Sequence, residues 1–283
     1  MKMMTKFLST VVLSLTCAVS MAAGGNYPWD KAPNRLNDNA ALQNGAKIFV
    51  NNCLNCHSAK SMRYSKLREI GLTDEQIKNN LLFTGERVGD MMTIAMTRAD
   101  GTMWFGAAAP DLTVMARSKS LNAGPPGGDY IYTYLRTFYR DTTKPTGWNN
   151  LAFPNAGMPH VLWDMQGPRE LTSTVVKQVE KDGQPAWEKV TTVYGPEGYW
   201  TSNIEPLVGY NGSASETHRF KALDPQLARQ YDSDMADLAA FMTWMSDPSQ
   251  LKRKQIGVWV LLFLGIFFVI AWRLNASYWK HVK

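Results

Sequence analysis

The stretch Cys53-Leu54-Asn55-Cys56-His57 constrains the fold of this chain more than any other. Two thiols separated by two residues and followed at once by a histidine form the attachment motif of a c-type haem. In that motif the thiols add to the two vinyl groups of one porphyrin, and the histidine binds the iron on one face. The sequence therefore predicts one covalent haem c, held by Cys53 and Cys56, with His57 as the proximal iron ligand.

Two other kinds of site use a pair of cysteines at this spacing. A zinc site needs a second pair of Cys or His residues at ligand spacing, and the sequence offers none. A thioredoxin-like dithiol is expected in a βαβ unit, whereas residues 44–52, which precede the motif, have a helical pattern. Both observations favour the haem.

The N-terminal residues have the features of an export signal. Lys2 and Lys6 precede an apolar run at 7–19, and Ser20-Met21-Ala22 supplies the small residues that a signal peptidase requires. Residues 1–22 are therefore predicted to be a cleaved signal peptide. Cys17 lies within them, in surroundings that lack the small residue and the leucine of a lipoprotein signal. The mature chain then keeps only the two cysteines of the haem motif.

The charge of the chain argues against one large class of function. The formal net charge is +6 at pH 7, and the signal peptide takes two lysines with it. The remaining excess is mild, and no basic stripe interleaved with aromatic residues accompanies it, so binding to nucleic acid is not expected.

A second hydrophobic segment lies near the C-terminus, at residues 256–272. As a helix it is about 25 Å long, which is the short end of the range for a membrane span. Lys252-Arg253-Lys254 and Arg273 flank it, and Trp259 and Trp272 lie where interfacial aromatic residues are expected. A buried core helix is the alternative, but the terminal position and the basic flanks favour a membrane anchor.

The two hydrophobic segments together predict the topology of the chain. Basic residues are equally numerous on the two sides of the anchor, so the export signal decides the orientation. We expect a haem domain at 23–250 in the periplasm, a single transmembrane helix at 251–274 in the inner membrane, and a cytoplasmic tail at 275–283.

The body of the chain is predicted to be mainly α, a c-type cytochrome haem domain with loop and small β-hairpin insertions. Capping residues and helical spacing of apolar residues predict helices at 37–57, 67–70, 73–83 and 129–139, and a last soluble helix that Asp224-Pro225 opens. Alternating apolar and polar residues predict a β-hairpin with strands at 174–179 and 187–193.

A haem iron with one histidine has a sixth position, which a Met thioether or a second His can fill. Met158 is the leading candidate, because it lies in an irregular Pro- and Gly-rich segment, residues 153–159, that can hold a side chain over a haem face. His160, two residues on, is the main rival, and Met165 is a further one. Ligation by His and Met gives the haem iron a higher reduction potential than ligation by two His residues.

The order of these features along the chain resembles the cytochrome c1 family. The haem motif is followed by Ala109-Pro110-Asp111-Leu112-Thr113, by Gly127-Gly128-Asp129-Tyr130, by the segment 154–159, and by a helix with a single anchor. The haem motif is common to all c-type cytochromes, so the Pro-Asp-Leu and Asn-Ala-Gly-Met-Pro segments and the tail anchor carry the specificity. The resemblance covers the whole chain and points to a proteobacterial form.

The resemblance implies a haem subunit of the quinol–cytochrome c reductase, the cytochrome bc1 complex. Its partner subunits would be cytochrome b and the Rieske iron–sulfur protein, in a dimeric complex. The haem would accept one electron from the Rieske protein and pass it to a cytochrome c. The chain alone would catalyse no reaction, because the oxidoreductase activity belongs to the complex.

The resemblance also assigns roles to single residues. The family's axial methionine falls on Met158. The Pro-Asp-Leu segment lies close to the haem in relatives, which puts Pro110 near His57 and makes Arg117 a candidate partner for the haem propionates. The alternative for Arg117 is a helix cap in solvent. The departure from the family is expected at 171–194, where relatives vary in length.

Two other functions are compatible with a single haem motif and an anchor. One is a different membrane-anchored c-type cytochrome that donates electrons to another periplasmic or oxidase partner. The other is a haem peroxidase or sensor with an open sixth position, although such peroxidases usually carry two haem motifs and this chain has one. Partner subunits that travel with the chain would separate these functions.

Overall fold

The computed structural model describes residues 27–121, 124–181 and 184–281. The chain forms two compact units, each described here by itself: unit 1 comprises Met1–Lys31 and Ser120–Ala228, and unit 2 comprises Ala32–Lys119 and Arg229–Lys283. The predicted signal peptide, with Cys17, lies outside the described residues.

Unit 2 contains the haem motif at the end of a helix. The helix α2 (Asn39–Ile48) continues as a π-helical turn over Phe49–Cys53. It begins where Asp38 accepts hydrogen bonds from the backbone N–H groups of Ala40 and Ala41, at 3.0 and 3.2 Å, which satisfies two of the unpaired donors of a helix start. The helix predicted at 37–57 is therefore confirmed in its body, and it ends at the first cysteine of the motif.

A glycine lets α2 approach the helix α8 (Pro225–Ser246) closely. A Cβ atom on Gly45 would lie 2.3 Å from the backbone oxygen of Asp237 and 2.6 Å from the Cβ of Phe241. One turn further along the chain, at the start of the π-helical turn, the ring of Phe49 packs against that of Phe241 with their centroids 5.6 Å apart. Only a residue without a side chain fits at position 45, so the sequence of α2 sets the distance between the two helices.

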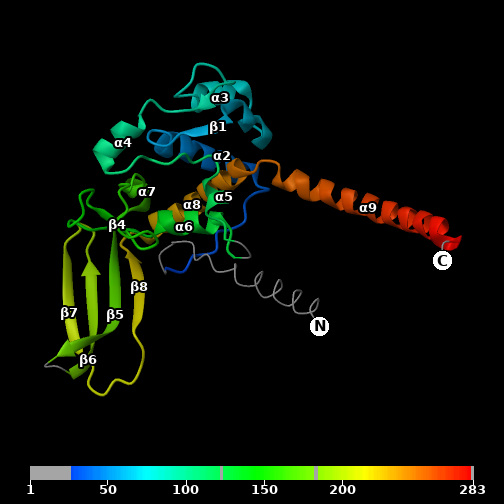
Figure 1. Ribbon diagram of the computed structural model, residues 1–283. Helices are drawn as coiled ribbons and strands as arrows, with labels where there is room; N and C mark the ends of the chain where they lie inside the picture. The colour runs from blue at the N-terminus through cyan, green and yellow to red at the C-terminus, as the bar shows by residue number, and fades with distance from the viewer. Residues whose placement is uncertain (1–26, 122–123, 182–183, 282–283) are drawn as a thin grey trace. The chain divides into compact units, whose positions relative to one another are not determined.

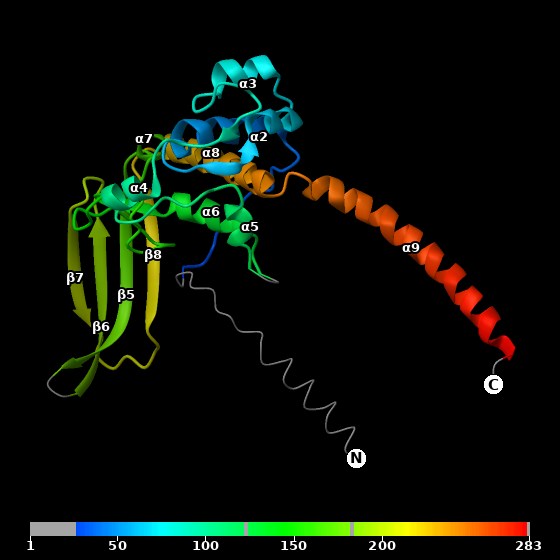
Figure 2. The same ribbon diagram turned by 45° about the horizontal axis from the view of Figure 1, so that its top comes forward.

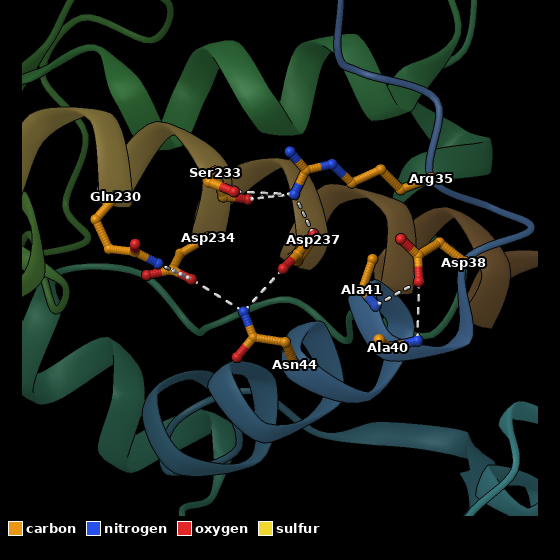
Figure 3. Close-up of polar contacts among 9 residues, drawn as sticks. All are labelled: Arg35, Asp38, Ala40, Ala41, Asn44, Gln230, Ser233, Asp234 and Asp237. Carbon is orange, nitrogen blue, oxygen red and sulfur yellow. Dashed lines mark hydrogen bonds and ion pairs between the residues drawn. The ribbon is translucent and has the colours of Figure 1, made fainter.

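Polar contacts surround this helix crossing (Figure 3). Asp237 accepts hydrogen bonds from Arg35, which precedes α2, and from Asn44 on α2 itself, the latter at 2.8 Å. Asn44 also donates to Asp234 at 2.9 Å. The side chain of Asp237 is only 10% exposed, so its charge is compensated by the Arg35 guanidinium. These contacts hold the helix that leads into the haem motif against α8.

The remaining elements of unit 2 are short, except for the last helix. Thr73 opens α3 with a capping box that it forms with Gln76, and Thr97 opens α4 in the same way with Asp100. Their bounds are as follows: β1 Ala59–Arg63, a 3-10 helix Tyr64–Ile70, α3 Asp74–Asn80, β2 Met91–Met92, α4 Arg98–Phe105, α5 Met115–Ser118, α9 Gln250–Tyr278 and a 3-10 helix Trp279–His281.

The helix α9 carries the predicted anchor (Figure 1). Within its segment Lys252–Tyr278, the most apolar window of 18 residues has a mean hydropathy of 2.3, and none of that window is buried within the described part of the chain. A core helix of a soluble unit would bury much of that surface, so the alternative of a core helix is not supported. The length and composition of α9 are consistent with membrane anchoring.

The described part of unit 1 combines the helix α6 and the short helix α7 with most of the β-structure. Phe138 and its neighbours pair antiparallel with Asn150 and its neighbours, so β3 and β4 form a small ribbon directly after α6. The elements are α6 Gly127–Arg136, β3 Phe138–Arg140, β4 Trp148–Asn150, α7 Trp163–Gln166, β5 Arg169–Lys181, β6 Gln184–Tyr194, β7 Trp200–Pro206 and β8 Ser215–Ala222.

The fold class predicted as mainly α is only partly supported, because 43% of the described residues are helical and 21% are strand. The predicted hairpin is confirmed, but its strands β5 and β6 are 13 and 11 residues long. They are the inner pair of a four-stranded antiparallel sheet of order β7-β6-β5-β8 (Figure 2). The outer strands were missed because exposed polar residues dominate them: β7 is exposed throughout, and in β8 the only apolar residues are Phe220 and Ala222 near its end, too few to predict a strand.

Candidate functional site

The turn after α2 brings the two cysteines of the motif to one side. The backbone N–H groups of Cys56 and His57 both donate to the carbonyl oxygen of Cys53, at 3.1 and 2.9 Å. Residues three apart in such a turn lie on the same face, so Cys53 and Cys56 are side by side, as two thioether bonds to one porphyrin require. Both are free thiols, Cys53 buried and Cys56 half-buried.

The imidazole of His57 is oriented by a backbone carbonyl. His57 Nδ1 lies 2.7 Å from the carbonyl oxygen of Pro110. A carbonyl oxygen can only accept, so Nδ1 carries the proton and Nε2 keeps its lone pair. A hydrogen bond of this kind fixes the ring and raises the basicity of the nitrogen that binds a metal. The structure thus places Pro110 at His57, the juxtaposition that the resemblance implies, while its role toward a haem stays a prediction.

The segment that contains Pro110 is held against the residues that follow the haem motif. Leu112 N donates to the carbonyl oxygen of Ser58 at 2.9 Å, and Lys60 N donates to Asp111 Oδ2 at 2.8 Å. Asp111 in turn accepts from the hydroxyl of Thr113 at 2.6 Å. These hydrogen bonds fix the Pro-Asp-Leu-Thr segment in the conformation that directs the carbonyl oxygen of Pro110 to His57.

The protonation states of these residues fit a haem site better than the two alternatives. Burial, reinforced by Cys56, raises the pKa of the Cys53 thiol to about 12, whereas a redox dithiol needs a lowered pKa. Burial lowers the pKa of His57 against the opposing effects of Pro110 and Asp111, so the imidazole is neutral at pH 7, the form that binds a metal. Within the described residues no group of three or more Cys, His, Asp or Glu side chains could hold a zinc ion.

The structure gives Arg117 a partner other than a haem. Arg117 lies in α5, its side chain is 69% exposed, and its Nη1 is 3.9 Å from Asp247 Oδ2. A contact of this length at the surface contributes little to stability. The pairing of Arg117 with a propionate stays a prediction.

In unit 1, Met158 lies in an irregular segment, as its Pro- and Gly-rich sequence predicts. It is half-buried, and its Sδ atom accepts a hydrogen bond from the hydroxyl of Tyr134 on α6 at 3.5 Å. Burial, and then the neighbouring Tyr130, raise the pKa of Tyr134, so its hydroxyl stays protonated near neutral pH. This contact lies between residues 24 positions apart and no sequence pattern indicated it.

Two consecutive asparagines in β4 hold the Met158 segment, and neither was predicted from the sequence. Asn150 is 1% exposed; its amide donates to the carbonyl oxygen of Tyr134 at 2.7 Å, and its Oδ1 accepts from Phe153 N at 2.9 Å. Asn149 accepts from Asn155 N at 2.8 Å. Asn155 has φ 61°, a left-handed conformation that Asn tolerates better than most residues. Two adjacent Asn in a strand, which Asn otherwise avoids, were the available signal.

The rival ligand His160 occupies an aromatic core. It is 2% exposed and stacks on Phe138 with ring centroids 4.7 Å apart, and Trp148 contacts it edge-on at 4.9 Å. Burial, and then Arg169, lower its pKa to about 3. A histidine packed between two rings of its own unit is a core side chain, so these contacts favour Met158 over His160 as the residue that is available to a metal.

Several known proteins are similar to this chain over most or nearly all of its length. A cytochrome c1 of Allochromatium vinosum is 38% identical over 280 residues, which cover 99% of this chain and 100% of that protein. A protein named ammonia monooxygenase gamma subunit, from Nitrosomonas europaea, is 34% identical and covers 99% of both chains. A cytochrome c1 of Rhodospirillum rubrum is 26% identical, covering 87% of this chain and 83% of its own length.

The model of the Cytochrome C1 family matches residues 29–189 and 225–282. The unmatched stretch, 190–224, contains β7 and β8, so the departure from the family starts at the end of the predicted hairpin region and lies mostly beyond it. The family implies a c-type haem, which the two free thiols and the oriented imidazole fit. Because the family model covers most of the chain and the Allochromatium relative spans all of it, this chain belongs to the cytochrome c1 family.

Proposed function

We propose that this chain is the haem subunit of a quinol–cytochrome c reductase, in which it takes one electron from a Rieske iron–sulfur protein and passes it to a cytochrome c. Family membership supports the coarser statement, a haem electron-transfer subunit of the cytochrome bc1 complex. The observation that carries the proposal is the haem motif with its oriented histidine: Cys53 and Cys56 on one face and His57 bound to Pro110 at 2.7 Å.

In this proposal Cys53 and Cys56 attach one haem c, and His57 and Met158 are its axial ligands. When bound, the haem supplies a one-electron couple at its iron. The protein supplies the ligands and their orientation: Pro110 fixes the tautomer of His57, and Asn149 and Asn150 hold the Met158 segment. Since no proton or group is transferred, no general acid or nucleophile is required.

The proposal includes a place in the cell. The apolar helix α9 supports a single-pass anchor in the inner membrane, and the predicted signal peptide supports a haem domain at 23–250 on the periplasmic side. The anchor would occupy 251–274 and the cytoplasmic tail 275–283. Cytochrome b and the Rieske protein are the proposed neighbours in a dimeric complex.

The experiment that tests the assembly is purification of the intact chain from membranes in mild detergent. The chains that travel with it are then identified by mass spectrometry, and quinol-dependent reduction of a cytochrome c is measured. Cytochrome b and a Rieske protein are expected. If the chain instead travels with a different oxidase, or with a monooxygenase such as the one after which the Nitrosomonas relative is named, it is a membrane-anchored donor to another partner and the proposal is wrong.

The ligand assignment has its own test, because sulfur bound to ferric haem iron gives a weak near-infrared charge-transfer band. The band is expected in the unmodified chain and lost in Met158→Leu. Met165→Leu is the matched control, since Met165 is also half-buried and lies seven positions on. A band that survives in Met158→Leu and disappears in Met165→Leu or His160→Ala contradicts the assignment.

A further inference from the structure

The hydroxyl of Tyr134 makes a directed contact with the sulfur of Met158. The Oη–Sδ distance is 3.5 Å. A thioether has no hydrogen to give, so the tyrosine must be the donor and the sulfur the acceptor. The contact lies wholly within unit 1. It occupies one of the two sulfur lone pairs and leaves the other free for a metal.

The ring of Tyr134 is held so that its hydroxyl cannot easily turn away. One helical turn earlier, the ring of Tyr130 stacks on it at a centroid distance of 5.9 Å and an interplanar angle of 18°. One turn later, the ring of Phe138 meets it edge-on at 5.1 Å. The side chain is therefore wedged between two rings that come from the same stretch of chain.

The same residue also anchors the backbone of the segment that carries Met158. The carbonyl oxygen of Tyr134 accepts a hydrogen bond from Asn150, and Asn150 in turn accepts from Phe153 N. Tyr134 thus determines where the segment starts, through its carbonyl, and where the sulfur lies, through its hydroxyl. Any residue at position 134 would make the carbonyl contact, whereas the contact with the sulfur requires the tyrosine hydroxyl.

We propose that Tyr134 is the positioning residue for the thioether of Met158, and that its hydroxyl tunes the strength of that sulfur as an iron ligand. The inference rests on the proposed function, in which Met158 is the sixth ligand. A hydrogen bond to the sulfur withdraws electron density from it, so the sulfur donates less to the iron. Because ferric iron depends more on this donation than ferrous iron, the ferric state is destabilised relative to the ferrous state. Hydrogen bonds to ligand atoms are a recognised means of tuning haem potentials. Tyr134 therefore raises the reduction potential.

The test compares Tyr134→Phe with Tyr130→Phe in the full-length, haem-loaded chain in detergent. Phenylalanine keeps the ring contacts with Tyr130 and Phe138 and removes only the hydroxyl, so covalent haem content should stay at the level of the unmodified chain. In Tyr134→Phe the ratio of reduced to oxidised haem at a fixed potential should fall about threefold, which is about 28 mV at 59 mV per tenfold for one electron. The charge-transfer band should remain and move in energy. Tyr130→Phe, which removes a tyrosine hydroxyl one turn earlier on the same helix, should change neither the reduction potential nor the energy of the band.

Met158→Leu, measured in parallel, separates failure of this inference from failure of the proposed function. If Met158→Leu loses the band but Tyr134→Phe matches Tyr130→Phe in potential and band energy, the role of Tyr134 is refuted and the ligand assignment stands. A higher potential in Tyr134→Phe refutes the direction of the argument. If Met158→Leu keeps the band, both the ligand assignment and the inference built on it are wrong.

Discussion

Replacement of Gly45 by alanine tests how tightly α2 and α8 pack at their crossing. The new Cβ atom would lie 2.3 Å from the backbone oxygen of Asp237, 2.8 Å from its carbonyl carbon and 2.6 Å from the Cβ of Phe241. Backbone atoms and a Cβ cannot rotate away, so the two helices must separate. Their separation strains the hydrogen bond from Asn44 to Asp237 and the ion pair from Arg35 to Asp237 (Figure 3).

Two opposing effects decide the magnitude. Overpacking of a filled interface costs about 1–3 kcal/mol, and contact with immobile atoms puts Gly45→Ala at the upper end. Alanine is a better helix former than glycine by about 1 kcal/mol, which offsets part of the cost. The net expectation is a loss of about 2 kcal/mol. For a chain of this size that corresponds to a fall in Tm of ~4–8 °C.

The assay is thermal melting of the full-length chain in detergent, followed by far-UV circular dichroism. Gly101→Ala is the matched control, because Gly101 is also a buried helical glycine but a Cβ there would meet its nearest atom at an ordinary 3.4 Å. The control should melt at the temperature of the unmodified chain or slightly above it. If Gly45→Ala does the same, the crossing is not tightly packed and the reasoning is refuted.

Three further changes have defined outcomes. Burial, and then Arg169, lower the pKa of His160 to about 3 in the folded chain, against about 6.5 in the unfolded chain. The stability that depends on neutral His160 is therefore complete above about pH 6.5 and is lost as the pH falls from there toward about 3. His160→Phe should make Tm less dependent on pH in this acid range, and an unchanged slope would contradict this. A chain that ends after Pro248 should be exported, carry covalent haem and stay in solution without detergent, because the apolar window of α9 is not buried against the described residues. A haem-free or insoluble product would show that α9 is part of the core. Arg117→Gln should make the reduction potential more dependent on pH if the guanidinium neutralises a propionate, and a potential that is unchanged across neutral pH would leave Arg117 as a surface partner of Asp247.

Features that depend on neighbouring residues were predictable from the sequence. The helix α2, its π-helical end and the turn after it were predicted as a single helix at 37–57. The reason is that capping residues start this stretch and apolar residues follow at helical spacing within it. The hairpin of β5 and β6 was predicted because apolar and polar residues alternate in each predicted strand and the sequence between them is polar, and the two strands pair as expected. The strands β7 and β8 were missed, because an exposed strand at the edge of a sheet is held by backbone hydrogen bonds that any sequence can make.

The sequence by itself determined the haem motif, the helix that leads into it and the apolar span of α9, because each is a pattern within one continuous segment. Only the tertiary structure decided which residues support the ligands. Pro110 reaches His57 from 53 positions away, and Asn150 and Tyr134 meet across 16. These residues meet because the chain folds back on itself. How it folds back is set by packing within each whole unit, as at Gly45, and cannot be read from the local order of residues.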